Sequence, residues 1–523
     1  MARRIITICI LLIFLSLGMA WLSSGFESLQ GWGSFLAVSI LGTGLFFGAL
    51  RATRRESIPR WLIWIILGGL ALRLVLGVFW FIALPLWGYD SDAEVAGYVM
   101  SDAYYRDTAA WELAQSERPL TDAFSAYRSV DQYGGLLFFS ATIYRYLGGG
   151  LVHHPLLIVI LTATASSLAI LFLWAFVRRL LGDGAARIAA WIYVFYPDAV
   201  LLGGSQMREA FTMTITAAAI YGLVLALREK TWQGGFWMLV ALLLSVPLSP
   251  AYTMLLVFVL GLATMFLIGD RWLRDWRLWA VVGGLLIVGL VGLLFFGAQI
   301  SQGDPINPIV VFQFWVERTG IWQTILSYQY SGWMYKLSQN ISAGLYKWVV
   351  LVYGVVQPFL PAALIANGNW LWRSIAIWRA LGWTLLLPIL IYVPLRAVRK
   401  PRQWFVFGMS LAIWLVIFAA SFRSGGDQWD NPRYRVAFSS LQIAVAAWVW
   451  VDQQRSPDPW LRRILVSASF VVVWFLPWYL RRYVPFDWSV IDVFKVFGLG
   501  LSSSALYLIW DWARSHDEDG SQP

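Results

Sequence analysis

WLIWIILGGLALRLVLGVFWFIALPLW, residues 61–87, runs directly into GYDSDAEVAGYVMSDAYYRDTAAWELAQSERPLTDAFSAYRSVD, residues 88–131. The first segment is longer than the roughly 20 apolar residues that a helix needs to cross a bilayer. The second holds nine of the chain's 29 acidic residues and only three of its 39 basic ones. Carboxylates beside a bilayer are costly unless they have a function. We therefore interpret residues 88–131 as a catalytic loop next to a membrane.

The composition extends this interpretation to the whole chain. Hydrophobic residues make up 59% of the 523 residues and charged residues 13%, whereas a soluble domain has about 25% charged residues. Apolar runs of about 20 residues recur from end to end, which predicts an all-α, polytopic transmembrane helical bundle of about 13–15 spans. The spans are expected at residues 5–23, 33–50, 61–87, 155–177, 186–203, 209–227, 233–249, 251–269, 277–298, 341–365, 377–395, 403–422, 436–452, 462–480 and 491–510.

We expect one transmembrane domain over residues 1–510, with residues 88–154 as a large first external loop that carries short interfacial helices. Residues 134–149 are too short and too interrupted for a span, and we expect them to lie in the interface as an amphipathic helix. Residues 299–340 form a second long loop rich in aromatic residues. This loop either covers the site as a lid or lies on the headgroups. Residues 511–523 are polar and are expected to form a disordered tail.

The basic residues predict the orientation of the chain. They gather in short loops between spans, which the positive-inside rule places in the cytoplasm, so the net charge of +10 does not indicate a nucleic-acid partner. We expect a multi-pass protein of the plasma (inner) membrane with a cytoplasmic N-terminus. The polar segments 88–131, 196–209 and 423–435 then share the extracytoplasmic side. The count of crossings fails between 298 and 396, where Pro358 and Pro361 are candidates to break span 341–365.

The first candidate for chemistry is Ser101-Asp102-Ala103-Tyr104-Tyr105-Arg106-Asp107, at the start of a stretch with helical character. Asp102 would lie in the first turn, on one face with Tyr105 and Arg106. Such a carboxylate is a candidate general base for a hydroxyl acceptor. The alternative is a structural helix start, in which Ser101 caps the helix and Asp102 favours its positive end. Asp90 and Asp92 form a D-x-D pair, which is a candidate for holding a divalent cation through oxygen ligands.

Two further segments bring charges to the same side. Arg208 and Glu209 open an otherwise apolar span shortly after Tyr196-Pro197-Asp198, and ion pairing between neighbours or placement at the membrane boundary is the alternative. Arg433 and Arg435 enter a late span on the extracytoplasmic side, against the positive-inside trend. Arginine binds phosphate oxygens with paired hydrogen bonds, so these two are candidates for binding a lipid phosphate. The alternative for them is pairing with Asp427 or Asp430.

The order of these motifs resembles the GT-C superfamily of integral-membrane glycosyltransferases, and within it the branch of protein O-mannosyltransferases and lipid A aminoarabinose transferases. The family's acidic motif is often Asp-Glu followed by an aromatic residue. Asp102-Ala103-Tyr104-Tyr105 matches it with alanine in the place of the second acid. Asp131-Gln132-Tyr133-Gly134-Gly135-Leu136 resembles the family's turn into a short helix but lacks its usual prolines. Glu209 matches a second external acid, and Pro432-Arg433-Tyr434-Arg435 resembles the arginine-bearing segment before a late span.

The resemblance, which covers residues 60–270 best, implies a polyprenyl-phosphate sugar donor and an external active site that inverts the anomeric carbon. The acceptor would be a hydroxyl of a protein, lipid or glycan, and Asp102 and Glu209 would be the catalytic residues. Some related oligosaccharyltransferases use a divalent metal and the lipid A branch does not, so Asp90 and Asp92 stay the metal candidates. The substrate-binding residues would be Tyr104, Tyr105, Asp107, Arg208, Arg433, Tyr434 and Arg435.

Three other interpretations stay open. One is a polysaccharide polymerase or ligase that uses a diphosphate-linked donor. Another is a lipid or glycan transporter, although transporter charges usually lie in mid-membrane and often in related halves of the chain. The third is a non-enzymatic membrane scaffold, against which the concentration of acids and arginines on one face argues. The identity of the sugar and of the acceptor, the metal dependence and the oligomeric state do not follow from the residues.

Overall fold

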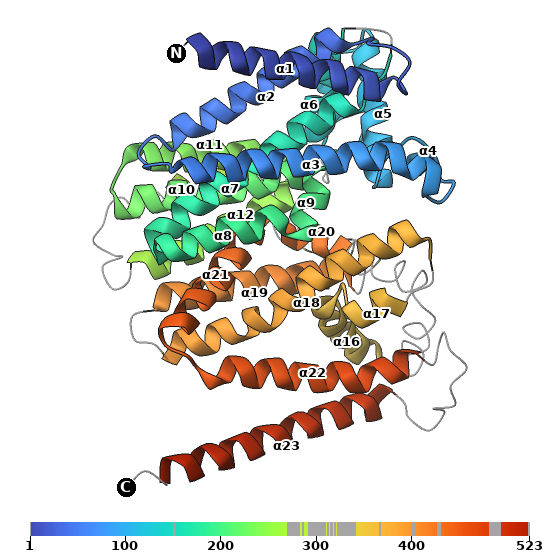
Figure 1. Ribbon diagram of the computed structural model, residues 1–523. Coiled ribbons are helices and arrows are strands. Elements are labelled where there is room, and N and C mark those ends of the chain that lie inside the picture. The colour runs from blue at the N-terminus through green and yellow to red at the C-terminus, as the bar shows by residue number, and fades with distance from the viewer. Residues whose placement is uncertain are drawn as a thin grey trace.

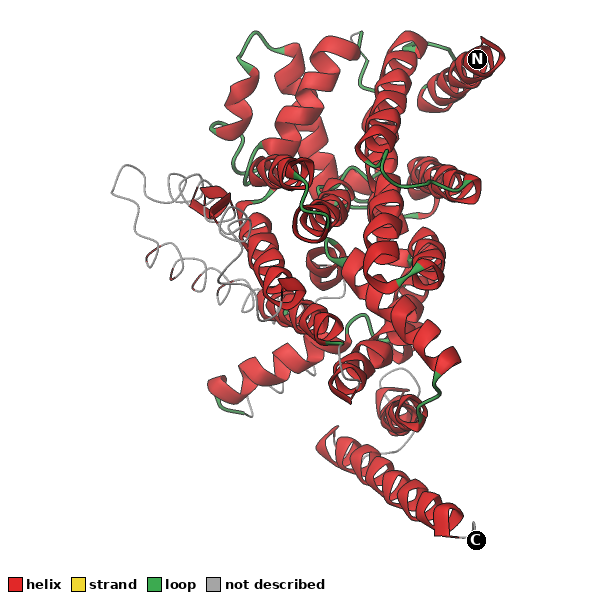
Figure 2. Cartoon of the chain, turned by 90° about the vertical axis from the view of Figure 1, so that its left-hand side faces the viewer, coloured by secondary structure: helices red, strands yellow, loops and turns green. Residues whose placement is uncertain are grey.

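The computed structural model describes residues 2–149, 152–268, 283–284, 287–290, 341–365, 368–399, 403–425, 430–480 and 493–520, together with the single positions 310, 313, 317 and 321. All regular secondary structure in these ranges is helical. The long helices lie side by side in a bundle, with α1 (Ala2–Ser23) and α2 (Trp32–Ala52) at one edge (Figure 1) and α22 (Pro459–Leu480) and α23 (Val493–Gly520) at the other. Figure 2 shows several of these helices end-on.

The membrane-spanning character of the chain is confirmed by the lengths of its helices. Nine helices in the described ranges are long and apolar enough to cross a membrane, or ten if the bent pair α8 (Asp183–Phe195) and α9 (Pro197–Gly203) is one span. The remaining helices are α3 (Arg60–Trp87), α4 (Asp92–Val95), α5 (Ser101–Gln115), α6 (Gly135–Leu147), α7 (Leu156–Leu181), α10 (Glu209–Arg228), α11 (Trp232–Leu248), α12 (Pro250–Ile268), α16 (Ala343–Val356), α17 (Leu360–Ile365), α18 (Trp370–Arg399), α19 (Trp404–Ser424), α20 (Asp430–Val436) and α21 (Ser439–Arg455), with a 3₁₀ turn at Leu120–Phe124.

Most of these helices begin and end within a few residues of the predicted spans. The expected interfacial helix at 134–149 is α6. The expected span 277–298 and the second long loop, 299–340, lie outside the described residues apart from the few positions given above. The expected tail after residue 511 is helical as far as Gly520, because α23 continues through it.

The centre of the bundle is α7. In its most apolar segment of 18 residues, 94% of the residues are buried inside the protein. Helices α2, α3, α8 and α10 pack around it. The hydroxyls of Thr162 and Thr164 are buried there, and each donates to a carbonyl four residues earlier, at 3.2 and 2.7 Å. Because their hydrogen bonds are made within the helix, these polar side chains are tolerated in the core. In contrast, only 17% of the residues in the apolar segment of α1, Ile6–Ser23, are buried, so most of its apolar side chains face away from the rest of the protein.

Two of the expected spans are broken at prolines. The axes of α8 and α9 differ by 57° where Tyr196 is followed by Pro197, since proline removes a backbone donor and its ring prevents a straight continuation of the helix. The span expected at 341–365 is divided into α16 and α17 around Pro358, as the sequence suggested. The first of these breaks buries Asp198 inside the protein.

The basic loops meet one another at one end of the bundle. Arg179 at the end of α7 binds Glu56, which precedes α3, at 2.5 Å. Arg396 near the end of α18 binds Asp452 of α21 at 2.7 Å. At the opposite end of α3, Tyr89 accepts a hydrogen bond at 2.8 Å from the backbone N–H of Asn369, just before α18. The basic loops, which the positive-inside rule places in the cytoplasm, therefore share one end of the bundle. The acidic loop lies at the other end.

Candidate active site

Three helices from distant parts of the sequence bring charged side chains together at the end of the bundle that holds the acidic loop. Arg433 of α20 donates a hydrogen bond from Nη2 to Asp102 Oδ2 of α5 at 3.0 Å. The Nε atom of the same arginine lies 3.5 Å from Glu209 Oε1, at the first residue of α10. The three predicted polar segments therefore converge, with Arg433 between two carboxylates.

The start of α5 gives Asp102 its position. The residue before the helix is Met100, which makes no side-chain cap, and Asp102 lies in the first turn. Ser101 is therefore not the capping residue that the structural alternative requires. The Asp102 side chain is 50% exposed, whereas that of Arg433 is 10% exposed. Asp102 thus presents a half-exposed carboxylate, of which Oδ2 is bound by the nearly buried Arg433.

The surrounding charges keep Asp102 ionised. Burial by itself raises the pKa of this carboxyl, but the charges of Arg433, Arg106 and Arg208 outweigh burial and hold the pKa below its usual range. An ionised carboxylate accepts hydrogen bonds and donates none. Asp102 is therefore able to accept a hydrogen bond from a hydroxyl or an amine that approaches from solvent.

A second group of side chains supports these three from behind. Arg106 of α5 lies with its Nε atom 3.5 Å from Asp131 Oδ2, and both side chains are buried. Asp131 also accepts the backbone N–H of Leu137 at 3.1 Å and so fixes the start of α6. The guanidinium of Arg208 lies 5.1 Å above the ring of Tyr133 and donates to the Leu248 carbonyl at 3.3 Å.

The electrostatics of Asp131 follow the same pattern as those of Asp102. Burial raises the pKa of Asp131. Arg208, Arg106 and two backbone N–H groups lower the pKa by more than burial raises it, so that it lies below its usual range. Asp131 and Glu209 in turn stabilise the charge of Arg208. The negative charges of these two carboxylates therefore balance the positive charge of Arg208.

Arg435 is placed differently from Arg433, although both come from α20. Its side chain is fully buried, and its guanidinium lies 3.3 Å above the ring of Trp383 in α18. None of its three side-chain nitrogens has a hydrogen-bond partner in the described part of the chain. Next to it, Arg379 donates to Asp198 at 2.6 Å, with both side chains 2% exposed. Tyr434, between the two arginines in sequence, is partly exposed.

Asp107, expected to bind substrate, lies in a separate buried cluster. It accepts hydrogen bonds from the hydroxyls of Tyr98 at 2.6 Å and Tyr144 at 2.8 Å, and His153 Nε2 lies 2.9 Å from it. Burial and the Asp107 charge raise the pKa of both tyrosines well above its usual value. Because its two oxygens are already occupied, this geometry favours a structural role for Asp107 over direct binding of substrate.

The two tyrosines after Asp102 differ in exposure. Tyr104 packs edge-on against Tyr98, with ring centroids 5.5 Å apart. Tyr105 is 55% exposed and contacts Tyr104 at 5.2 Å. Of the two, Tyr105 is the side chain that is open to a bound molecule.

Two charged residues of this region were not singled out from the sequence. The sequence indicates Arg106 only as a neighbour of Asp102 and gives Arg379 no role. The available signal for Arg379 was its position within an otherwise apolar run, because ionisable residues in spans usually face the protein interior and find a partner there. For Arg106 no local signal existed, since its partner Asp131 is separated from it by a turn and a loop.

The described residues contain no group of three or more His, Cys, Asp or Glu side chains placed to hold a metal ion. Asp92 is the first residue of the short helix α4, whose start is capped by Ser91. Asp90 and Asp92 therefore lack the further ligands that a cation site needs within these ranges.

Comparisons with known proteins return solved structures alone. No protein-family model matches the chain, and no curated protein matches it. Three similar solved structures are of the oligosaccharyltransferase of Archaeoglobus fulgidus, a GT-C family enzyme. The apo form is 16% identical with a TM-score of 0.42, over 84% of this chain and 56% of that one.

The other two structures of this enzyme give similar values. The complex with an inhibitory peptide and a dolichol-phosphate is 15% identical with a TM-score of 0.40, over 85% of this chain and 56% of that one. The complex with Zn and sulfate is 14% identical with a TM-score of 0.40, over 83% and 53%. The chain thus spans about half the length of the solved structures it matches, and identities and TM-scores this low do not assign it to a family.

Proposed function

We propose that the protein is a membrane glycosyltransferase that transfers a sugar from a polyprenyl-phosphate donor to a hydroxyl acceptor on the extracytoplasmic face. The observation that carries the proposal is the meeting of Asp102, Glu209 and Arg433 at the end of the bundle opposite the basic loops. An exposed carboxylate beside a nearly buried arginine suits a reaction in which the carboxylate removes a proton from the acceptor and the arginine stabilises the phosphate that is released. The resemblance of the motifs around these residues to GT-C enzymes supports the same reaction.

The proposed chemical step uses these side chains in an in-line displacement. The acceptor hydroxyl gives its proton to the Asp102 carboxylate while its oxygen forms a bond to the anomeric carbon. The bond from that carbon to the phosphate oxygen breaks on the opposite side, which inverts the centre, and its electron pair leaves with polyprenyl phosphate. Arg433 stabilises the charge that develops on this phosphate. Glu209 faces the partial positive charge that such a transition state places on the sugar ring.

The contact between Arg433 and Asp102 couples donor binding to the base. While Arg433 binds Asp102, the pKa of the carboxyl stays low and Asp102 is a weak base. A donor phosphate that binds Arg433 competes for the same guanidinium, because phosphate and carboxylate oxygens use the same donors. Asp102 then becomes more basic only when the donor is in place, which limits wasteful reaction with water.

Two further parts of the site have supporting roles in this proposal. Arg208 is fixed in place by its contact with the ring of Tyr133 and its hydrogen bond to the Leu248 carbonyl. Its positive charge attracts the neighbouring Glu209 carboxylate and so positions it. Arg435 has a buried guanidinium without a described hydrogen-bond partner, which favours it as a second cation for the donor phosphate. Tyr105 is exposed beside Asp102 and is free to stack on a bound substrate.

The test is sugar transfer in proteoliposomes that contain the full chain, with a panel of polyprenyl-phosphate sugars and hydroxyl acceptors. We expect Asp102→Asn to abolish transfer without loss of folding, while Glu112→Gln, an exposed acid on the same helix, stays active. Transfer at a near-normal rate by Asp102→Asn would remove Asp102 from the chemistry. Activity only with diphosphate-linked donors would favour a polymerase or ligase, and movement of unmodified lipid without transfer would favour a transporter.

A further inference from the structure

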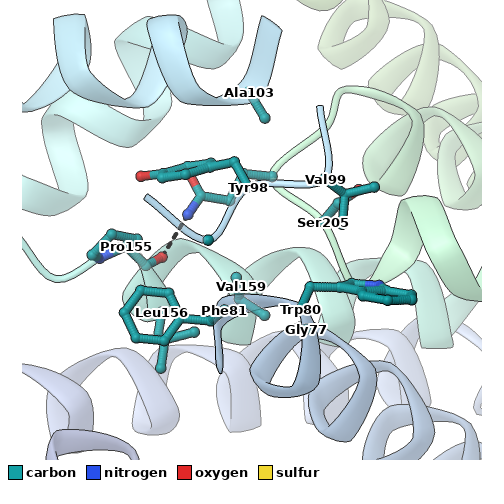
Figure 3. Close-up of a pocket in the computed structure, with 13 residues that line it drawn as sticks. Gly77, Trp80, Phe81, Tyr98, Val99, Ala103, Pro155, Leu156, Val159 and Ser205 are labelled. Carbon is teal, nitrogen blue, oxygen red and sulfur yellow. Dashed lines mark hydrogen bonds between the residues drawn. The ribbon is translucent and has the colours of Figure 1, made fainter. Parts of the chain in front are cut away.

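The two ends of α3 differ in how far the rest of the protein covers them. Towards the acidic loop, Trp80 is 4% exposed, and Gln206 donates from Nε2 to the Pro155 carbonyl at 2.7 Å, the dashed line in Figure 3. At the other end, where α3 begins beside the basic loops, Trp64 is 73% exposed. The start of α3 is therefore open to a partner from outside the chain.

The basic loops at this end carry more positive charge than the protein itself neutralises. They hold nine basic and three acidic side chains, within residues 51–60, 178–187 and 228–230. Each of the three acids forms an ion pair with Arg55, Arg178 or Arg179. Arg60 and Arg187 are exposed and take no part in these pairs. The charges of these two arginines are thus directed to the surroundings of the protein.

Arg60 and Arg187 are brought to the same place although they lie on different helices. Arg60 is the first residue of α3, Arg187 lies in the second turn of α8, and the two helices pack against each other. The Arg187 guanidinium lies 5.7 Å from the centre of the Trp61 ring, and Trp61 follows Arg60 in sequence. The described start of α3 has neither an acidic residue in its first turn nor a side-chain cap. The positive end of this helix therefore adds to the attraction for an anion.

Exposed aromatic side chains continue from both arginines towards the middle of the bundle. Trp64 follows Arg60, and Trp191 follows Arg187, by four residues in each case, which is about one turn or 6 Å along the helix. Trp191 is 49% exposed, and its ring stacks on that of Phe195 one turn further on, with centroids 6.1 Å apart. Both helices thus present a cation first and an aromatic surface deeper in, which is the order of a phospholipid's headgroup and chains at a membrane surface.

From this order of charge and aromatic surface we infer that the starts of α3 and α8 together bind an anionic phospholipid of the leaflet beside the basic loops. Arg60 and Arg187 bind the headgroup phosphate, because guanidinium groups form paired hydrogen bonds with phosphate oxygens. Trp64, Trp191 and Phe195 contact the glycerol and the upper part of an acyl chain. A zwitterionic lipid binds less tightly, since the excess positive charge repels its ammonium group. This lipid site is separate from the proposed sugar transfer and does not depend on it.

The first experiment measures lipid binding to the delipidated full-length protein in detergent by native mass spectrometry. The probes are phosphatidylglycerol and phosphatidylcholine with the same acyl chains. Wild-type protein should prefer phosphatidylglycerol, and Arg60→Gln and Arg187→Gln should each weaken its binding about fivefold, the effect of one basic residue beside an anionic lipid. Arg51→Gln is the matched control and should leave binding unchanged, because Arg51 is an exposed arginine at the same end of the bundle but on α2.

Three results would overturn the inference. An equal loss in Arg51→Gln would show a diffuse attraction of the whole basic end in place of a site. Equal wild-type affinity for the two lipids, or unchanged binding by the double variant Arg60→Gln/Arg187→Gln, would show that these arginines do not select an anionic headgroup. Soluble glycerol phosphate that binds as tightly as phosphatidylglycerol would show that the anion alone is recognised and the lipid is not.

The second experiment tests the aromatic part of the lipid site with the same assay. The double variant Trp64→Ala/Trp191→Ala should weaken both lipids by a similar factor of roughly 3 to 10, because the two lipids share their glycerol and chains. The control is Trp232→Ala, which should change neither, since Trp232 is 77% exposed at the start of α11. Circular dichroism checks that each variant is folded. Unchanged binding of both lipids by the folded double variant would contradict the proposed position of the lipid.

Discussion

Breaking the ion pair between Asp198 and Arg379 should destabilise the protein far more than breaking an exposed pair of the same length. Both side chains of this pair are 2% exposed and 2.6 Å apart. Arg178 and Asp183 lie 2.7 Å apart, but their side chains are 30% and 79% exposed. The two pairs therefore have nearly the same length and differ strongly in exposure, and Arg178 also donates to Ser57 at 3.0 Å and lies 3.8 Å from Glu56.

The expected magnitudes follow from that difference. Two unit charges 4 Å apart attract by about 1 kcal/mol in water and about 4 kcal/mol at an effective dielectric constant of 20. Removing one partner of a buried pair leaves a desolvated charge and typically costs about 3–5 kcal/mol, whereas an exposed pair contributes about 0–1 kcal/mol. We expect Asp198→Asn to fall in the first range and Asp183→Asn in the second.

The assay is unfolding of purified protein in mixed micelles with increasing denaturing detergent, followed by circular dichroism. The double variant Asp198→Asn/Arg379→Gln removes both charges and should lose less stability than the two single variants added together. The reasoning would be refuted if Asp198→Asn cost no more than Asp183→Asn, or if the single losses simply added. The first result would mean that water reaches the pair, and the second that the two charges do not interact.

Three further predictions concern the site and the topology. Arg433→Gln should lower kcat by about 10²-fold and move the acid limb of the pH profile of kcat/KM, which reports the free enzyme, to higher pH, because Asp102 then loses the cation that lowers its pKa; an unshifted limb of kcat/KM would contradict the coupling. The ionised Asp131 stabilises the folded wild type at a pH above about 3.9, the usual pKa of this carboxyl, because its pKa in the folded protein is lower. This stabilisation should be lost as the pH falls through the lower pKa of the folded protein. Asp131→Asn should be less stable at neutral pH and should not show this loss in acid unfolding curves. Finally, in a background without the native cysteine, a cysteine at Glu117 should react with an impermeant maleimide on intact cells, and one at Asp183 only after permeabilisation; the reverse pattern would invert the proposed orientation.

The sequence predicted the helical spans closely because a span is a local property. A run of about 20 apolar residues must satisfy its backbone hydrogen bonds internally in lipid, and only a helix does this within one segment. Residues 61–87 and 209–227 therefore reappear as α3 and α10 almost without change. The prolines at 197 and 358 likewise act on their own helices, so the two breaks follow from the local sequence.

The sequence by itself determined the class of fold and the end of the bundle at which the charged loops gather, since the length and the charge of each segment fix both. Only the tertiary structure decided which charges meet. Arg433 binds Asp102 across 331 positions in sequence, and Asp107, five residues from Asp102, joins Tyr98 and Tyr144 instead. These choices depend on how α5, α10 and α20 pack in the folded protein.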